Sequence, residues 1–156
     1  MQSLFKAIGC LCLWLAASCI AAQPGSPGVQ DFNENTWAEL LQSGPRPAAY
    51  LFTTSYCSTC PQAFSQLVAA VGKSRRKVPL VAVMMDVEGA QAQRHAVHFQ
   101  GLTQLYAFDG FEPAIRQSVD PAWPNITPYV VLIDRHGRLQ RSIGAPKAQA
   151  LQTWLQ

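Results

Sequence analysis

The fold is decided by the stretch Thr53-Thr54-Ser55-Tyr56-Cys57-Ser58-Thr59-Cys60-Pro61. The apolar segment 47–52 before this stretch predicts a short buried strand. The segment 62–71 after it carries apolar residues at the three-and-four spacing of one helix face, which predicts a helix. We therefore expect both cysteines where a strand ends and a helix begins.

That position favours thiol chemistry. The first turn of a helix has backbone N–H groups without internal partners and the positive end of the helix dipole. Helix N-termini and C-x-x-C settings lower the pKa of a cysteine thiol. Cys57 is predicted to be the nucleophile because it lies first and nearer the solvent, and Cys60 the resolving thiol one turn further in. Pro61 suits a first helical turn, where no N–H is missed.

A C-x-x-C pair has two other common uses. A structural zinc site needs about four ligands, and no second Cys pair or Cys/His pair follows in the sequence. A static disulfide that closes so short a loop contributes little stability by the chain-entropy argument. Redox chemistry is the preferred interpretation, with no metal and no other cofactor expected.

The composition predicts a folded domain with some additional chain. The 156 residues are 49% hydrophobic and 13% charged, so the chain can bury a core. Its formal net charge of +3 is too small to predict a nucleic-acid partner. The basic run 73–77 is interpreted as a solvated helix end.

The first residues predict export. Segment 1–22 combines Lys6 with the apolar run 7–22 and small residues at its end, the layout of a secretory signal peptide. The run is shorter than the roughly 20 residues of a membrane-spanning helix. We expect a periplasmic protein, with a flexible tether over 23–32 and the folded domain over 33–156.

Two processing sites fit this signal. The segment Leu15-Ala16-Ala17-Ser18-Cys19 resembles a lipobox, which would lipidate Cys19 and attach the protein to a membrane. Cleavage after Ala22 by the ordinary signal peptidase fits as well. In both cases Cys57 and Cys60 are the only free thiols left in the folded part.

Strand and helix patterns alternate along the domain and predict an α/β fold with a mixed sheet flanked by helices. The segment 78–86 is a near-continuous apolar run, typical of a strand buried on both faces. Turn residues between 129–133 and 138–143 predict a hairpin. The remaining expected elements are helices over 36–41, 88–99, 112–119 and 146–155 and a short strand over 105–108.

This order of elements resembles the thioredoxin fold across 33–156. The segment 100–119 resembles the insertion of the exported TlpA/ResA branch, and 131–139 is similar to the LIDxxGxL segment of that branch. The resemblance implies a thiol-disulfide oxidoreductase that acts on protein disulfides, in the reductase or isomerase direction, with a membrane or periplasmic redox partner.

The resemblance also implies further site residues. Pro128 is expected in the cis form facing the disulfide, with the backbone of Thr127 pairing with an extended substrate. Tyr56 stands where the family usually has tryptophan and is expected to contact substrate. Leu51 and Ala63 stand where relatives carry a buried acid, so water or backbone is expected to serve as the base for Cys60.

Two alternative functions remain open from the sequence. SCO-type copper proteins share the fold and use two cysteines with a histidine, and His95 and His98 are the candidate ligands here. The gap of two residues between the cysteines differs from the three of that class, and solvated positions on a helix are the simpler interpretation of both histidines. The other alternative is a redox-inert interaction lipoprotein on the same fold.

Overall fold

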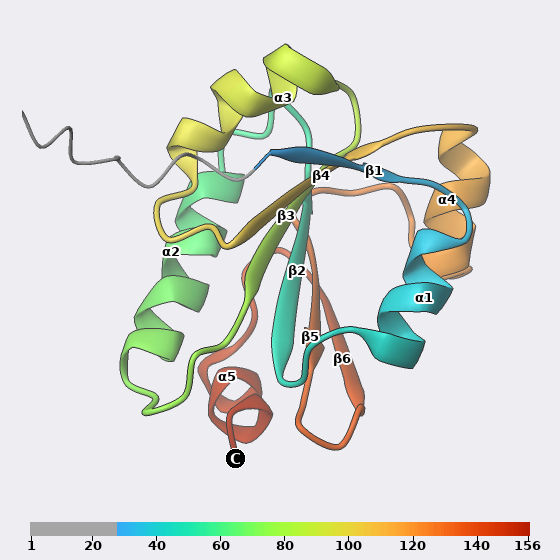
Figure 1. The fold of residues 1–156 in the computed structure, drawn as a ribbon. Coiled ribbons are helices and arrows are strands. Elements are labelled where there is room, and N and C mark those ends of the chain that lie inside the picture. The colour runs from blue at the N-terminus through green and yellow to red at the C-terminus, as the bar shows by residue number, and fades with distance from the viewer. Residues whose placement is uncertain (1–27) are drawn as a thin grey trace, which may run out of the picture.

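The most apolar segments of the chain become the central strands of one sheet, shown in the computed structural model in Figure 1. The structure describes residues 28–156. The elements in chain order are β1 (Val29–Phe32), α1 (Thr36–Ser43), β2 (Ala48–Thr53), α2 (Cys60–Gly72), β3 (Leu80–Met84), α3 (Gly89–His95), the 3-10 helix η1 (Ala96–His98), β4 (Gln104–Phe108), α4 (Glu112–Val119), β5 (Tyr129–Ile133), β6 (Leu139–Ile143) and α5 (Ala148–Trp154).

The six strands lie in the order β1-β4-β3-β2-β5-β6. The first four in this order run parallel, whereas β5 is antiparallel to β2 and β6 is antiparallel to β5. The carboxyl ends of β1, β2, β3, β4 and β6 therefore meet the amino end of β5 at one edge of the sheet. We call this edge the cysteine edge, because Cys57 follows β2 there.

Alternating residues of β2 supply two cores. Ala49 and Leu51 face the cluster built with α2, α3, η1 and α5, whereas Tyr50 and Phe52 face the cluster built with α1 and α4. All six residues of β2 are buried, as a strand covered on both faces requires. The described residues 28–156 therefore bury an apolar core on each face of the sheet. The expected α/β fold with a central mixed sheet is confirmed.

The sequence missed β1. Val29–Phe32 lies within the predicted tether 23–32, and it pairs in parallel with β4 along its whole length. The tether prediction is wrong for these residues, and the folded domain begins before residue 33. The segment 100–119, predicted as an insertion, supplies β4 and α4, and β4 lies between β1 and β3 within the sheet.

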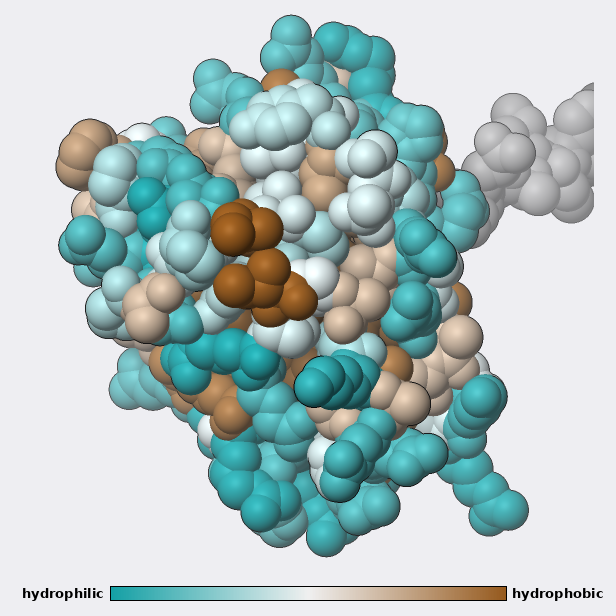
Figure 2. Space-filling model, turned by 180° about the vertical axis from the view of Figure 1, so that it is seen from behind, coloured by the Kyte–Doolittle hydropathy of each residue, from teal (hydrophilic) through white to brown (hydrophobic). Residues whose placement is uncertain are grey.

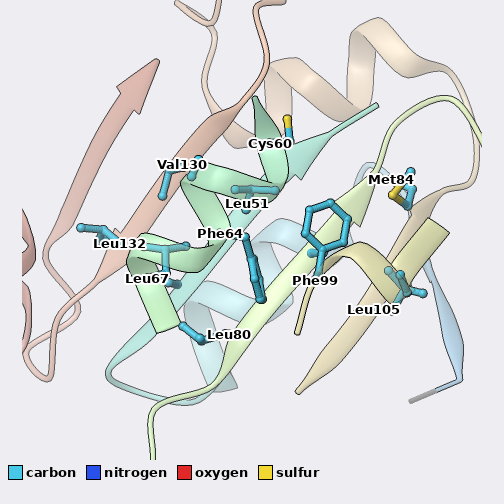
Figure 3. Close-up of a cluster of buried hydrophobic side chains, with 14 of the residues drawn as sticks. Leu51, Cys60, Phe64, Leu67, Leu80, Met84, Phe99, Leu105, Val130 and Leu132 are labelled. Atoms are coloured by element: carbon cyan, nitrogen blue, oxygen red, sulfur yellow. The ribbon is translucent and has the colours of Figure 1, made fainter. Parts of the chain in front are cut away.

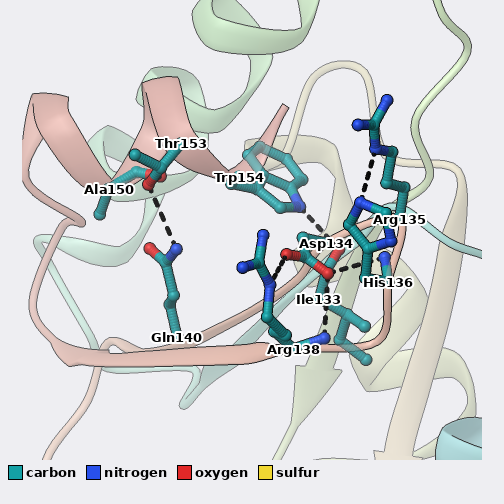
Figure 4. A network of polar contacts seen from close by, with 9 residues as sticks. All are labelled: Ile133, Asp134, Arg135, His136, Arg138, Gln140, Ala150, Thr153 and Trp154. Atoms are coloured by element: carbon teal, nitrogen blue, oxygen red, sulfur yellow. Dashed lines mark hydrogen bonds and ion pairs between the residues drawn. The ribbon is translucent and has the colours of Figure 1, made fainter. Parts of the chain in front are cut away.

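The hairpin of β5 and β6 matches its prediction and has a polar anchor. The Asp134 carboxylate accepts hydrogen bonds from the backbone N–H groups of His136 and Arg138 and from the Arg138 guanidinium (Figure 4). The Trp154 indole donates to the Ile133 carbonyl 2.9 Å away and ties α5 to the same strand end.

The predicted signal 1–22 and the lipidation site Cys19 lie outside the described residues. Between residues 28 and 156 no helix is long and apolar enough to cross a membrane.

Candidate active site

The two cysteines lie at the junction of β2 and α2, as the sequence predicts. The Cys57 N–H donates to the Thr54 carbonyl, and the Cys60 N–H donates to the Cys57 carbonyl. These two turns carry the chain from the strand into α2, which begins at Cys60 with Pro61 in its first turn. The helix dipole and the open N–H groups of that turn are therefore directed at the sulfur atoms.

The cysteines form a disulfide with sulfur atoms 2.01 Å apart and Cα atoms 5.5 Å apart. Their surroundings differ. Cys57 is half-buried, whereas Cys60 is fully buried in the apolar cluster beside Leu51 and Phe64 (Figure 3). An attacking group from solvent can therefore reach Cys57 and not Cys60.

The Thr127–Pro128 peptide bond is cis, as the resemblance implies, and Arg46–Pro47 is a second cis bond that the sequence did not predict. The register pairs Phe52 with Tyr129, so the Thr127–Pro128 bond lies beside the carboxyl end of β2 at the cysteine edge. Its position is fixed on the other side by the Gly144 N–H, which donates to the Pro128 carbonyl at 2.7 Å.

Tyr129 anchors the loop that contains this proline. Its ring stacks on Trp123 with centroids 4.3 Å apart, and its hydroxyl donates to the Asp120 carboxylate. That hydrogen bond lowers the pKa of Asp120, while burial and the same hydrogen bond raise the pKa of Tyr129. Trp123 and Tyr129 are buried, so they pack under the loop as part of the core. Tyr56, beside Cys57, is 79% exposed.

Asp86 is a site residue that the sequence analysis missed. It follows β3 at the cysteine edge, and its carboxylate accepts the Ser55 N–H at 2.9 and 3.0 Å and the Ser55 hydroxyl at 2.6 Å. Ser55 is two residues before Cys57, so Asp86 fixes the loop that presents the nucleophile. The acid at the end of the segment 78–86 pointed to this position, but its partner Ser55 lies 31 residues away in sequence.

Among the described residues, no carboxylate is buried next to Cys60, because the only buried acid is Asp134 in the hairpin turn. Leu51 is 0% exposed and Ala63 2% exposed, and both belong to the apolar cluster around α2. The expectation that water or backbone serves as the base for Cys60 therefore stays a prediction.

His95 and His98 pack against each other rather than forming an open ligand set, with ring centroids 5.1 Å apart. The pKa of His95 is lowered mainly by burial and secondly by the neighbouring His98. The negative charge of Asp86 partly offsets this lowering. Among residues 28–156 no cluster of three metal-ligating side chains occurs. No observation here favours the copper-delivery alternative.

The residues on both sides of Cys57, Ser55, Tyr56, Ser58 and Thr59, are exposed. A groove of about 620 Å³ lies between α2 and α5, but neither cysteine lines it. A substrate would therefore contact Cys57 at the exposed cysteine edge rather than inside a cavity.

Comparison with known proteins identifies the fold. The chain is similar to the thioredoxin domain of a thiol-disulfide oxidoreductase from Bacteroides vulgatus, with 10% identity, a TM-score of 0.54 and coverage of 71% of this chain and 80% of that one. It is also similar to a thioredoxin-related protein from Neisseria meningitidis serogroup B, with 14% identity, a TM-score of 0.53 and coverage of 74% and 87%. No family model and no curated protein sequence matches. The described chain has the thioredoxin fold.

Proposed function

We propose that this thioredoxin-fold chain is an exported thiol-disulfide oxidoreductase that acts on protein disulfides in the reductase or isomerase direction. The observation that carries the proposal is the asymmetric disulfide at the start of α2, with Cys57 reachable from solvent and Cys60 buried. The name of the similar Bacteroides protein, a thiol-disulfide oxidoreductase, agrees with this chemistry.

The reaction is a pair of thiol-disulfide exchanges. The Cys57 thiolate attacks one sulfur of a substrate disulfide, which forms a mixed disulfide and releases the other substrate sulfur as a thiolate. The Cys60 thiolate then attacks the Cys57 sulfur and releases the second substrate thiolate. Two electrons pass to the substrate, the Cys57–Cys60 disulfide is restored, and a dithiol redox partner must reduce it for another cycle.

Substrate recognition is proposed for Tyr56, Thr127 and Pro128. The backbone of Thr127 would pair with an extended substrate segment as an added strand. The cis bond beside the carboxyl end of β2 and the exposed ring of Tyr56 support this placement at the cysteine edge.

Export rests on the sequence of segment 1–22, and either lipidation of Cys19 or cleavage after Ala22 would deliver the domain to the periplasm. Lipidation predicts that acyl-chain labelling disappears in Cys19→Ser, and labelling that persists would contradict it. A membrane or periplasmic protein is the proposed redox partner.

The test compares two cysteine variants in insulin reduction. Cys57→Ser should abolish activity, because no nucleophile remains at the surface. Cys60→Ser should trap substrates as mixed disulfides on Cys57, which a non-reducing gel detects and dithiothreitol reverses. Mixed disulfides in equal amount on both variants would contradict the assigned roles, and full activity of Cys57→Ser would contradict the proposed function.

A further inference from the structure

The end of the molecule opposite the cysteine edge is strongly basic. The sequence alone shows one basic run, 73–77, but the fold places two more cationic loops beside it. These are the loop 44–47 before β2 and the hairpin turn 134–138 between β5 and β6. The Lys and Arg residues of the three loops are Arg46, Lys73, Arg75, Arg76, Lys77, Arg135 and Arg138.

The three loops are contiguous because they lie at the ends of β3, β2, β5 and β6, which neighbour one another in that order in the sheet. The Ala49 N–H at the start of β2 donates to the carbonyl of Pro79, two residues after the run 73–77, which holds the chain next to the first two loops together. The Arg46 guanidinium lies over Gly137 of the hairpin turn, where a Cβ would stand 2.7 Å from its nitrogen. All three loops lie at the lower end of Figure 1, and the same end is hydrophilic in Figure 2.

Almost none of this charge is neutralised within the described chain. The only carboxylate in the three loops is Asp134, which is 3% exposed and pairs with Arg138. Arg75, Arg76 and Lys77 are exposed, and no ion pair joins them to a carboxylate of residues 28–156. The Arg138 side chain is itself 75% exposed.

The cysteine edge has the opposite character. The segments that follow the strand ends there carry more acids than bases. The acids are Glu34, Asp86, Glu88, Asp109, Glu112 and Asp120, and the bases are Arg94, Arg116 and Lys147. Of these acids, only Glu112 and Asp120 form ion pairs within residues 28–156, with Arg116 and Arg141. The molecule therefore has a basic end and an acidic end although the formal net charge of the whole chain is only +3.

We propose that the basic end docks on an anionic phospholipid surface. A flat anionic surface can contact the basic end without approaching the acidic end, whereas a long nucleic acid that wraps the protein would meet both. Each Lys or Arg close to an anionic membrane strengthens such attraction, which acts within a Debye length. The apolar run 7–22, which predicts passage into or attachment to a membrane, places the chain beside such a surface.

This docking would hold the disulfide away from the lipid. Helix α2 begins at Cys60 and ends at Gly72, next to the basic loop 73–77. Its 13 residues, at 1.5 Å each, separate the two ends by roughly 20 Å. Cys57 would then face the aqueous side, where protein substrates and redox partners diffuse. The inference does not depend on the proposed redox function.

The experiment measures binding of the polypeptide 28–156 to vesicles by co-sedimentation, with its fold verified by circular dichroism. Vesicles of phosphatidylglycerol and phosphatidylcholine in equal amounts should bind it, vesicles of phosphatidylcholine alone should not, and 0.5 M NaCl should release it. Arg76→Glu should weaken binding roughly 30-fold, because the charge at the contact changes by two units.

The matched control is Arg94→Glu, which changes the net charge equally from the exposed surface of α3, away from the three loops in Figure 1. It should weaken binding less than about threefold. Equal losses in the two variants, equal binding to both kinds of vesicle, or tighter binding to a DNA duplex than to the anionic vesicles would each overturn the proposal. The insulin assay of the soluble polypeptide is independent of all these outcomes.

Discussion

At the scale of single residues, Asp86 is the main addition to the predicted site. The sequence indicates that it ends an apolar strand, so its place at the cysteine edge could be predicted. Its bonds to Ser55 could not, because they depend on how β2 and β3 lie in register. In the same way, the cysteine pair was predictable from spacing, but the support of the proline loop by Asp120 and Tyr129 was not.

We predict that Asp86→Ala loosens the loop before Cys57. The change removes the acceptor of the Ser55 N–H and hydroxyl, and hydrogen bonds to a carboxylate at the surface contribute about 1 kcal/mol. The Ser55 amide should therefore exchange its hydrogen about fivefold faster, as measured by native-state hydrogen exchange. Asp86→Asn should have a smaller effect because it keeps one acceptor oxygen.

Glu88→Ala is the control for this prediction, since Glu88 is a neighbouring exposed carboxylate whose side chain accepts no hydrogen bond from any of residues 28–156. An unchanged exchange rate of the Ser55 amide in Asp86→Ala would show that Asp86 does not fix the loop.

At the scale of elements, local patterns predicted most of the sheet and failed at its edge. The apolar runs of β2, β3 and β5 are buried on both faces, so composition alone identifies them. In contrast, β1 has one fully buried residue, Phe32, and follows a stretch rich in Pro, Gly and Ser. It is a strand because β4 offers a free edge, which is tertiary information that the sequence of β1 does not contain.

The turn of the hairpin is held by one polar side chain, Asp134. Burial raises the pKa of Asp134, but hydrogen bonds from Arg138 and His136 outweigh it and hold the pKa below its usual range. We predict that Asp134→Ala lowers the free energy of unfolding at pH 7 by about 2 kcal/mol, because the backbone N–H groups of the turn lose their acceptor. Urea unfolding measures this difference.

The pH dependence of that difference has a definite sign. A carboxyl group whose pKa is lowered by folding stabilises the protein fully above its unfolded pKa of about 3.9 and loses this contribution as the pH falls further. The difference in the free energy of unfolding between the wild type and Asp134→Ala should therefore be constant from pH 5 to 8 and become smaller below about pH 4. A gap that widens in acid would contradict the role assigned to the ionised carboxylate.

At the scale of the whole molecule, the charge distribution could not be predicted from the order of residues, because topology brings three separate loops to one end and the acids to the other. This distribution bears on the direction of the redox reaction. The Cys57 thiolate exists only in the reduced form, and it would lie at the edge that carries Asp86 and Glu88. Negative charge there opposes the helix dipole at Cys57, disfavours the thiolate and hence shifts the balance toward the disulfide.

We therefore predict that the oxidised protein is more stable than the reduced one, as a reductase requires, and that its reduction potential lies nearer about −270 mV than about −120 mV. Screening of the acidic edge should raise the potential by about 10 mV between 0.02 and 0.5 M NaCl. Glu88→Gln should raise the reduction potential in low salt. Arg76→Gln should leave the potential unchanged, because Arg76 lies at the other end of α2, roughly 20 Å from the cysteines. Equilibration with glutathione buffers measures all these values. A potential that falls with added salt would mean that cations, rather than the acids of the cysteine edge, dominate the field at Cys57.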